Sequence, residues 1–320
     1  MNREARKLLV VNALYALIPL LLAGLPLLFS GMALEAYGPG YALYMIGMEA
    51  GIIALPALLF FRTPLGREVQ SEGFWQRPKS ALLLVLPLAL CAYFFVNGVT
   101  ACWLALLQAL GLSQAAAAVP SPQTPGELAV ALLVVAVVPA LSEEFFFRGV
   151  LLPRLVRHFS PAAAILLGGA LFALVHGDLA SLPGHLLLGA GLALAAYWTR
   201  SIWYTALWHF LQNGIAVLIL YVSPRLLELT AGAQTAQSAA LAEEPLMLLA
   251  GGLMLLVPFG LGTALFLFLL WLTTKEHRPL PLPRAEGRLP GPAFAPLGAG
   301  LLCALLLYVL SGLQMAGVGL

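Results

Sequence analysis

Apolar runs of about 20 residues recur along the whole 320-residue chain. A run of this length, wound as an α-helix, crosses the roughly 30 Å hydrocarbon core of a bilayer. Inside lipid the backbone must satisfy its own hydrogen bonds, and an α-helix does so within one segment. The sequence therefore predicts an all-α, polytopic integral membrane protein with about nine spans, eight to nine in number. The candidate spans are 8–29, 41–61, 81–110, 128–159, 162–176, 182–199, 202–222, 246–273 and 294–315.

The composition supports this class and excludes others. Hydrophobic residues make up 61% of the chain and charged residues only 9%, whereas an average globular chain is about 25% charged. The formal net charge of +2 is too small, and the charges are too scattered, for a nucleic-acid-binding surface. The three cysteines all lie in apolar runs and indicate neither a disulfide framework nor a cysteine metal site. The first expected partner is therefore the lipid bilayer, with no nucleic acid.

The basic residues predict the orientation in the membrane, because cytoplasmic loops carry an excess of Lys and Arg. If the N-terminus is cytoplasmic and nine spans alternate, 15 of the 16 Lys and Arg residues fall on the cytoplasmic side, and only Arg225 lies outside. We therefore predict a cytoplasmic N-terminus, a cytoplasmic linker at 275–293 and an external loop at 223–245. The first apolar run is longer than the apolar core of a signal peptide usually is, so we interpret it as a retained helix.

The chain divides into three predicted regions. Residues 1–125 hold the first three spans, and residues 126–222 hold a core with most of the intramembrane polar groups. Residues 223–320 comprise the outer loop, the eighth span, a Pro- and Arg-rich linker and an accessory final span. The basic and aromatic segment 62–80 is typical of an interfacial helix or of an ordinary basic loop. We find no internal repeat, which weighs against an inverted-repeat transporter.

The strongest departure from the apolar pattern is the run Ser-Glu-Glu-Phe-Phe-Phe-Arg-Gly at 142–149, inside the fourth predicted span. Each charge at the middle of a span costs about 2.5 to 3.5 kcal/mol even on the lenient insertion scale, so the run needs a reason. Glu144 and Arg148 are four residues apart and can pair along one helix face. Glu143 is rotated by about 100° from Glu144 and has no such partner on its own helix. We therefore interpret Glu144 and Arg148 as a structural pair, which leaves Glu143 as the residue that needs an explanation.

A histidine on the fifth span is predicted to lie level with Glu143. This span ends in Phe172-Ala-Leu-Val-His176, and the turn before it is His158-Phe-Ser-Pro161. Positions 143 and 176 average to 159.5, the middle of that turn. In an antiparallel pair of helices both residues then lie about 24 Å from the turn, at 1.5 Å per residue. The sequence therefore predicts that Glu143 and His176 face each other.

The seventh span adds a second polar pair, His209 and Asn213, which share one helix face. A carboxylate and an imidazole in a water-poor pocket can activate a water molecule. His209 and Asn213 can donate hydrogen bonds to an oxyanion. The set therefore indicates hydrolysis of an acyl bond. Glu143, His176 and His209 could instead supply a zinc site with two histidines, one carboxylate and an open position, and the sequence leaves this alternative open.

Three motifs, in this order and on these spans, carry a resemblance to a known family. Glu-Glu-x-x-x-Arg at 143–148, Phe-x-x-x-His at 172–176 and His-x-x-x-Asn at 209–213 resemble the CAAX protease and bacteriocin-processing family, known as CPBP or ABI. The resemblance covers about residues 126–221. The roles it implies are water activation by Glu143 and His176, an oxyanion site at His209 and Asn213, and structural support by Glu144, Arg148 and Phe172.

The same resemblance implies an intramembrane glutamic endopeptidase that needs no cofactor. Its substrates would be membrane-associated, either prenylated proteins or peptide precursors, and its location would be a bacterial or archaeal cell membrane. A different class also fits the polar groups: a non-catalytic membrane protein, either a bacteriocin-immunity factor or a carrier that uses them as a proton relay. The absence of a repeat weighs against the carrier. His185, on the sixth span, could reach the same pocket, and we interpret Asp178 as a turn cap.

Overall fold

The computed structural model describes residues 2–29, 34–77, 82–112, 119–230, 244–275 and 291–317. In these ranges the chain is helical, and the only β-type pairing is an isolated bridge between Trp75 and Ser201. Seven stretches of the described residues are long and apolar enough to cross a membrane. The other two predicted spans correspond to the shorter apolar helix Pro161–Val175 and to the 18-residue helix Leu182–Thr199. The all-α membrane class is therefore confirmed, and the count of nine is approximate.

The elements follow one another in this order: α1 (Arg3–Leu28), α2 (Pro39–Ile46), η1 (Gly47–Ala54), α3 (Leu55–Phe60), α4 (Pro64–Ser71), α5 (Leu82–Ala109), α6 (Pro125–Ala131), η2 (Leu132–Val137), α7 (Val138–Phe146), η3 (Phe147–Leu151), α8 (Leu152–His158), α9 (Pro161–Val175), α10 (Leu182–Thr199), α11 (Ile202–Thr230), α13 (Pro245–Thr274), η4 (Gly291–Phe294) and α14 (Ala295–Met315). Helix α11 runs to Thr230 instead of ending at 222, so the start of the predicted external loop is helical. Residues 231–243 and most of the linker 275–293 lie outside the described residues.

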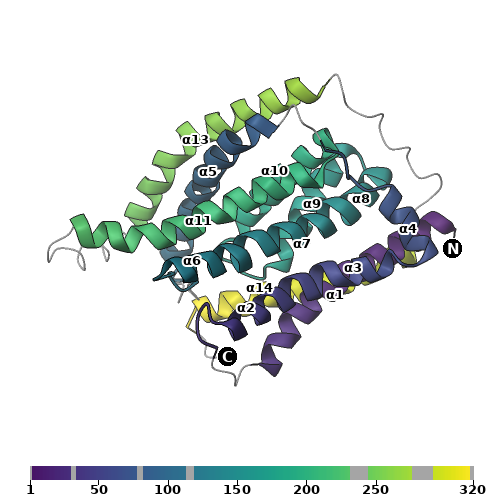
Figure 1. Ribbon diagram of the computed structural model, residues 1–320, viewed down its shortest axis with the longest axis horizontal. Helices are drawn as coiled ribbons and strands as arrows, with labels where there is room; N and C mark the ends of the chain where they lie inside the picture. The colour runs from purple at the N-terminus through teal and green to yellow at the C-terminus, as the bar shows by residue number, and fades with distance from the viewer. Residues whose placement is uncertain are drawn as a thin grey trace.

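The helices form a bundle around the continuous helical segment from α6 to α8 (Figure 1). Helices α9 and α10 pack against each other beside it, and α11 contacts η2, α7 and α5. Helices α5 and α13 pair along their lengths on one side of the bundle. On the other side α1 pairs with α14, and η1 packs against α7. Helix α7, which carries both glutamates of the sequence motif, therefore lies between the first helices of the chain and α11.

Three helical turns are wound as π-helix, and each ends two residues before a proline. Segments η1, η2 and η3 precede Pro56, Pro139 and Pro153 respectively. A proline inside a helix lacks an N–H donor, and its ring collides with the carbonyl four residues earlier. The turn before it widens to relieve this conflict, and such π-turns often lie at functional sites. All three π-turns adjoin the segment that carries Glu143.

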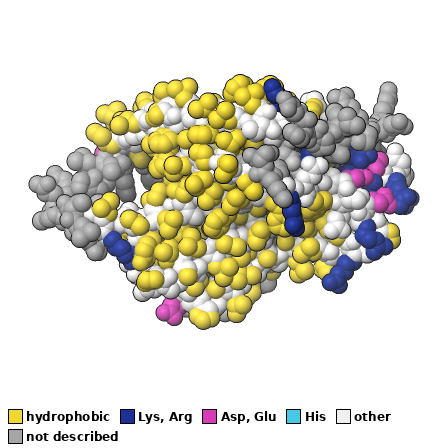
Figure 2. Space-filling view, turned by 45° about the horizontal axis from the view of Figure 1, so that its top comes forward, with side chains coloured by type: hydrophobic (Ala, Val, Ile, Leu, Met, Phe, Trp, Pro, Cys, Tyr) yellow, Lys and Arg dark blue, Asp and Glu magenta, His cyan; other side chains and the backbone are white. Residues whose placement is uncertain are grey.

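One end of the molecule is held by a network of ion pairs. Lys7 of α1 contacts Glu4 at 2.8 Å and Glu72, which follows α4, at 2.9 Å. Arg154 of α8 is fully buried and pairs with Glu4 at 3.2 Å and with Glu72. Figure 2 shows several basic and acidic side chains gathered at one end of the molecule, while the middle of this face is hydrophobic. The network joins three segments that are predicted to lie on one side of the membrane, and which side that is stays a prediction.

The final helix α14 packs against the bundle as well as against α1. Tyr308 of α14 donates a hydrogen bond to the carbonyl oxygen of Ala173 in α9 at 2.6 Å. Ser311 accepts one from the backbone N–H of Leu179 at 3.2 Å. From α1, Tyr15 donates to the carbonyl oxygen of Leu171 at 3.0 Å. The helix predicted to be accessory therefore buttresses the C-terminal end of α9, while the three-region division of the chain stays a prediction.

Candidate active site

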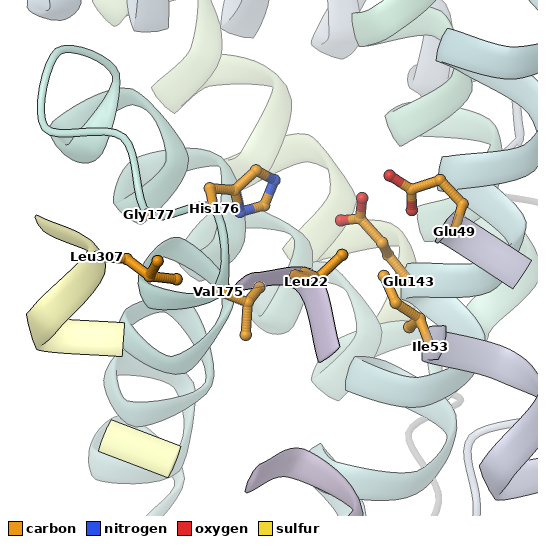
Figure 3. Close-up of a pocket in the computed structure, with 8 residues that line it drawn as sticks. All are labelled: Leu22, Glu49, Ile53, Glu143, Val175, His176, Gly177 and Leu307. Atoms are coloured by element: carbon orange, nitrogen blue, oxygen red, sulfur yellow. The ribbon is translucent and has the colours of Figure 1, made fainter. Parts of the chain in front are cut away.

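A cavity of about 320 Å³ lies where α1, η1, α7, α14 and the end of α9 meet. Its polar groups are the side chains of Glu49, Glu143 and His176 (Figure 3). The rest of its lining is apolar or backbone: Leu22, Ile53, Val175, Gly177 and Leu307. In Figure 3 the carboxylate of Glu143 lies between the imidazole of His176 and the carboxylate of Glu49. The predicted approach of Glu143 to His176 thus takes the form of a shared cavity, and Glu49 is a third polar member.

The two consecutive glutamates point into different surroundings. Glu143 lines the cavity, and its Oε2 is buried without a hydrogen-bond partner among the described residues. Glu144 is fully buried, and its Oε1 accepts hydrogen bonds from Arg148 Nη1 at 2.8 Å and from His209 Nδ1 at 3.0 Å. The ion pair expected between Glu144 and Arg148 is therefore present. The 100° step between neighbouring helix positions gives one carboxylate to the cavity and the other to the packing between helices.

Arg148 is held by more than its carboxylate partner. Its Nη2 donates to the carbonyl oxygen of Gly189 in α10 at 2.9 Å, and its guanidinium lies 4.5 Å from the centre of the Phe172 ring. The close approach of α10 depends on Gly189, because a Cβ there would lie 2.9 Å from Phe172 Cδ1. Phe172 also contacts both imidazoles, with ring centres 4.9 Å from His176 and 5.8 Å from His209. Phe172, predicted as a support residue, therefore lies against Arg148, His176 and His209.

His176 lies at the point where α9 ends. Gly177 follows it with a φ of 62°, a left-handed conformation that ends helices and favours glycine. The Nδ1 atom of His176 lies 2.9 Å from the carbonyl oxygen of Phe172. A carbonyl oxygen can only accept, so Nδ1 carries the hydrogen and Nε2 carries a lone pair in the neutral ring. Figure 3 shows this second nitrogen on the side of Glu143. The histidine thus presents a proton acceptor to the cavity.

A second histidine stacks on His176. The ring centres of His176 and His185 are 3.8 Å apart, with an angle of 22° between their planes. His185 Nδ1 lies 3.1 Å from the hydroxyl of Ser181, which in turn donates to Asp178. Asp178 also accepts the N–H of Ala180 at 3.0 Å, which confirms its predicted capping of the turn. The short polar chain from Asp178 fixes the ring that covers one face of His176.

The predicted oxyanion pair does not line the cavity in this structure. His209 uses Nδ1 to contact Glu144, and because a carboxylate oxygen only accepts, this nitrogen carries the hydrogen. Asn213 donates from Nδ2 to the carbonyl oxygen of Val135 at 3.0 Å. Val135 lies in the π-turn η2, which packs against α11. Asn213 therefore points toward the turn just before the segment that carries Glu143.

Sequence reasoning missed Glu49 and left His185 outside the motifs. Glu49 is the only charged residue between 41 and 61, and an isolated carboxylate in a span is a signal of function. The isolated carboxylate could therefore be seen in the sequence, but the sequence did not indicate which residue it would face. The contact of η1 with α7, which brings Glu49 to Glu143, follows from tertiary packing.

The structure offers little support for a zinc site. Among the described residues no group of three or more His, Cys, Asp or Glu side chains is arranged to hold a metal ion. Of the three zinc ligands suggested by the sequence, Glu143 and His176 line the cavity and His209 does not. Glu143, His176 and His209 therefore do not form the donor set of the zinc alternative in this arrangement.

The comparisons with known proteins point to the segment that carries these residues. Residues 125–215 match the family described as type II CAAX prenyl endopeptidase Rce1-like. This segment is similar to the Rce1-like family. The match confirms the resemblance to CAAX proteases that the three motifs indicate, and its name implies a membrane endopeptidase. No curated protein and no solved structure matches the chain. Outside the Rce1-like segment, Leu22, Glu49, Ile53 and Leu307 also line the cavity.

Proposed function

We propose that the protein is an intramembrane glutamic endopeptidase that hydrolyses a peptide bond with a water activated by Glu143 and His176. The observation that carries the proposal is the shared cavity, in which an unpartnered carboxylate oxygen and a lone-pair ring nitrogen lie on facing sides. Both groups accept hydrogen bonds. A water between them can donate one hydrogen to each and turn its own oxygen lone pair toward a substrate carbonyl.

The proposed reaction begins when the water oxygen attacks the carbonyl carbon of the scissile bond. The water proton moves to the Glu143 carboxylate, and the π electrons of the carbonyl move to its oxygen. Glu143 then passes this proton to the amide nitrogen, the C–N bond breaks, and the carbonyl forms again in the new carboxyl end. His176 keeps its own ring hydrogen on Phe172 and holds the water through Nε2. The residues alone thus supply the base and the acid of the reaction.

The surrounding polar groups fit supporting roles in this proposal. Glu144, Arg148 and Phe172 hold α7, α9 and α10 in their relative positions. Asn213 uses one N–H of its amide on Val135, and the second is the one we propose as an oxyanion donor. His209 joins it as a donor when Nε2 also carries hydrogen, because Nδ1 is occupied by Glu144. Preorganised donors of this kind are often worth 10²- to 10³-fold in turnover.

The proposed substrate is a peptide segment that enters the cavity from the membrane. Four apolar side chains, Leu22, Ile53, Val175 and Leu307, form the walls around the polar groups, which suits a chain carried by lipid or by its own apolar group. The CAAX name of the matching family favours a prenylated C-terminal peptide over a peptide precursor. We place the enzyme in the cell membrane of a bacterium or an archaeon.

The test is a cleavage assay with the purified full-length chain in detergent micelles. Matched peptides that end in a CAAX sequence, with and without a prenyl group, and a mixed peptide library are incubated and analysed by mass spectrometry. We expect cleavage at a defined bond, and its loss in Glu143→Gln purified in the same way. Equal cleavage by Glu143→Gln would reject the glutamic mechanism, and absence of cleavage throughout would favour a non-catalytic membrane protein.

A further inference from the structure

Glu49 is the polar group of the cavity that the proposed mechanism does not use. It lies in η1, outside the Rce1-like segment, and one of its carboxyl oxygens, Oε2, is buried without a hydrogen-bond partner among the described residues. Its carboxylate faces Glu143 from the side opposite His176 (Figure 3). Other polar groups near the cavity are already engaged: Glu144 with Arg148, and Tyr15 and Tyr308 with backbone carbonyls. Among the described residues, Oε2 of Glu49 therefore has only the cavity and its contents to interact with.

Two carboxyl groups that face one apolar cavity do not both ionise readily, because each negative charge disfavours the other and neither is well solvated. The charged and titratable groups around Glu49 and Glu143 are His176 across the cavity and the paired Glu144 and Arg148 behind α7. The base of the proposed reaction must be ionised, and Glu143 is the carboxylate that faces His176 across the cavity. The negative charge of the pair is therefore assigned to Glu143 and the shared proton to Glu49.

We propose that Glu49 is a further catalytic residue, which in its protonated form donates a hydrogen bond to the carbonyl oxygen of the scissile peptide bond. This inference rests on the proposed endopeptidase function. As water attacks, its proton goes to Glu143, and the Glu49 proton goes to the carbonyl oxygen, which gives a neutral gem-diol. When the C–N bond breaks, Glu143 returns its proton to the leaving nitrogen, and one diol hydroxyl returns a proton to Glu49. Atoms and charges balance, and the pair ends as it began.

The proposed donor role distinguishes Glu49 from a residue that only fills space. Glu49→Gln keeps the length of the side chain and a donor N–H, whereas Glu49→Ala removes the donor. We expect Glu49→Ala to lower kcat by roughly 10²- to 10³-fold with KM little changed, as for other oxyanion donors. Glu49→Gln should lose less kcat than Glu49→Ala but should stay below wild type, because its amide donates a hydrogen bond to the carbonyl oxygen and cannot transfer a proton to it. Glu35→Gln, an exposed carboxylate just before α2, is the matched control and should match wild type.

A second measurement needs no substrate. Infrared spectra of the full-length protein at neutral pH should contain the C=O band of a protonated carboxyl group, and the double variant Glu49→Gln/Glu143→Gln should lack it. If Glu143→Gln abolishes cleavage while Glu49→Ala leaves kcat unchanged, Glu143 keeps its role and the inference about Glu49 is overturned. Equal losses in Glu49→Ala and Glu49→Gln with a lowered unfolding temperature would mean a structural role and also overturn it. If no cleavage is ever found, the infrared band still decides whether the pair shares a proton.

Discussion

Removing the charge of Glu144 should damage folding, whereas removing the charge of Glu143 should damage only the chemistry. Glu144 is fully buried, and one of its carboxylate oxygens, Oε1, accepts hydrogen bonds from both Arg148 and His209. Glu144→Gln leaves the Arg148 guanidinium, which is 1% exposed, with the Gly189 carbonyl and the Phe172 ring as partners. Breaking a buried pair by removing one charge costs about 3 to 5 kcal/mol. That is a large part of the 5 to 15 kcal/mol that typically stabilises a domain.

Glu143 has no buried ion-pair partner among the described residues that its substitution would leave unpaired. Its Oε2 makes no hydrogen bond to a described residue, so Glu143→Gln replaces a group that packs against the cavity by one of nearly the same shape. We expect its stability to stay within about 0.5 kcal/mol of wild type, as for a substitution that breaks no named interaction. Its turnover should fall by 10²- to 10⁴-fold, the contribution of a general base. Two adjacent residues of one type should therefore fail in different ways.

The comparison uses denaturant or thermal unfolding in detergent beside the peptide-cleavage assay. Glu144→Gln/Arg148→Met removes both charges and should recover most of the stability that Glu144→Gln loses, since no uncompensated charge remains. Glu35→Gln, an exposed carboxylate just before α2, serves as the control. Wild-type stability in Glu144→Gln, or equal destabilisation of both single variants, would refute the assignment of one glutamate to structure and the other to chemistry.

Three further predictions concern the oxyanion site, metal dependence and topology. Asn213→Ala should lower kcat by roughly 10²- to 10³-fold with little change in KM. A loss of stability with unchanged kcat would mean that Asn213 has only the structural role of bonding the Val135 carbonyl. Strong chelators should leave activity intact, measured after dialysis against them, and complete loss with rescue by zinc would require a metal mechanism. In a background without Cys91, Cys102 and Cys303, an impermeant maleimide should label Glu244→Cys only from outside and Lys275→Cys only from the cytoplasm; the reverse pattern would invert the predicted orientation.

Much of the fold could be predicted because each membrane span carries its own signal. A run such as 246–273 is long and apolar whatever surrounds it, and it is helical from Pro245 to Thr274. The pairing of Glu144 with Arg148 follows from their spacing alone. That Glu143 and His176 line one cavity could be predicted, because a short turn, Phe159 and Ser160, joins their helices and fixes the relative depth of both residues.

The parts that could not be predicted depend on which helices pack together. The sequence shows Glu49 as a lone carboxylate but does not show that η1 lies against α7. It groups Asn213 with His209 by spacing, yet Asn213 donates to the carbonyl oxygen of Val135 on another helix. Helix α14 follows a long linker, so its position in the bundle cannot be predicted from sequence spacing. Its residue Leu307 nevertheless lines the cavity. Helix contacts of this kind are set by the summed packing of many side chains, none of which is decisive alone.

The π-turn η2 determines the direction around the helix axis in which the side chains after it point, along the long central helix. Such a turn takes about one residue more than an α-turn, so side chains beyond it are offset by about 100° from the positions that an unbroken α-helix would give them. The direction in which Glu143 points is therefore determined partly by Pro139 and the extra residue before it, and not by the local sequence of the Glu-Glu motif alone. A catalytic side chain and a structural one can exchange places in such a helix through a single inserted or deleted residue, with both glutamates left unchanged.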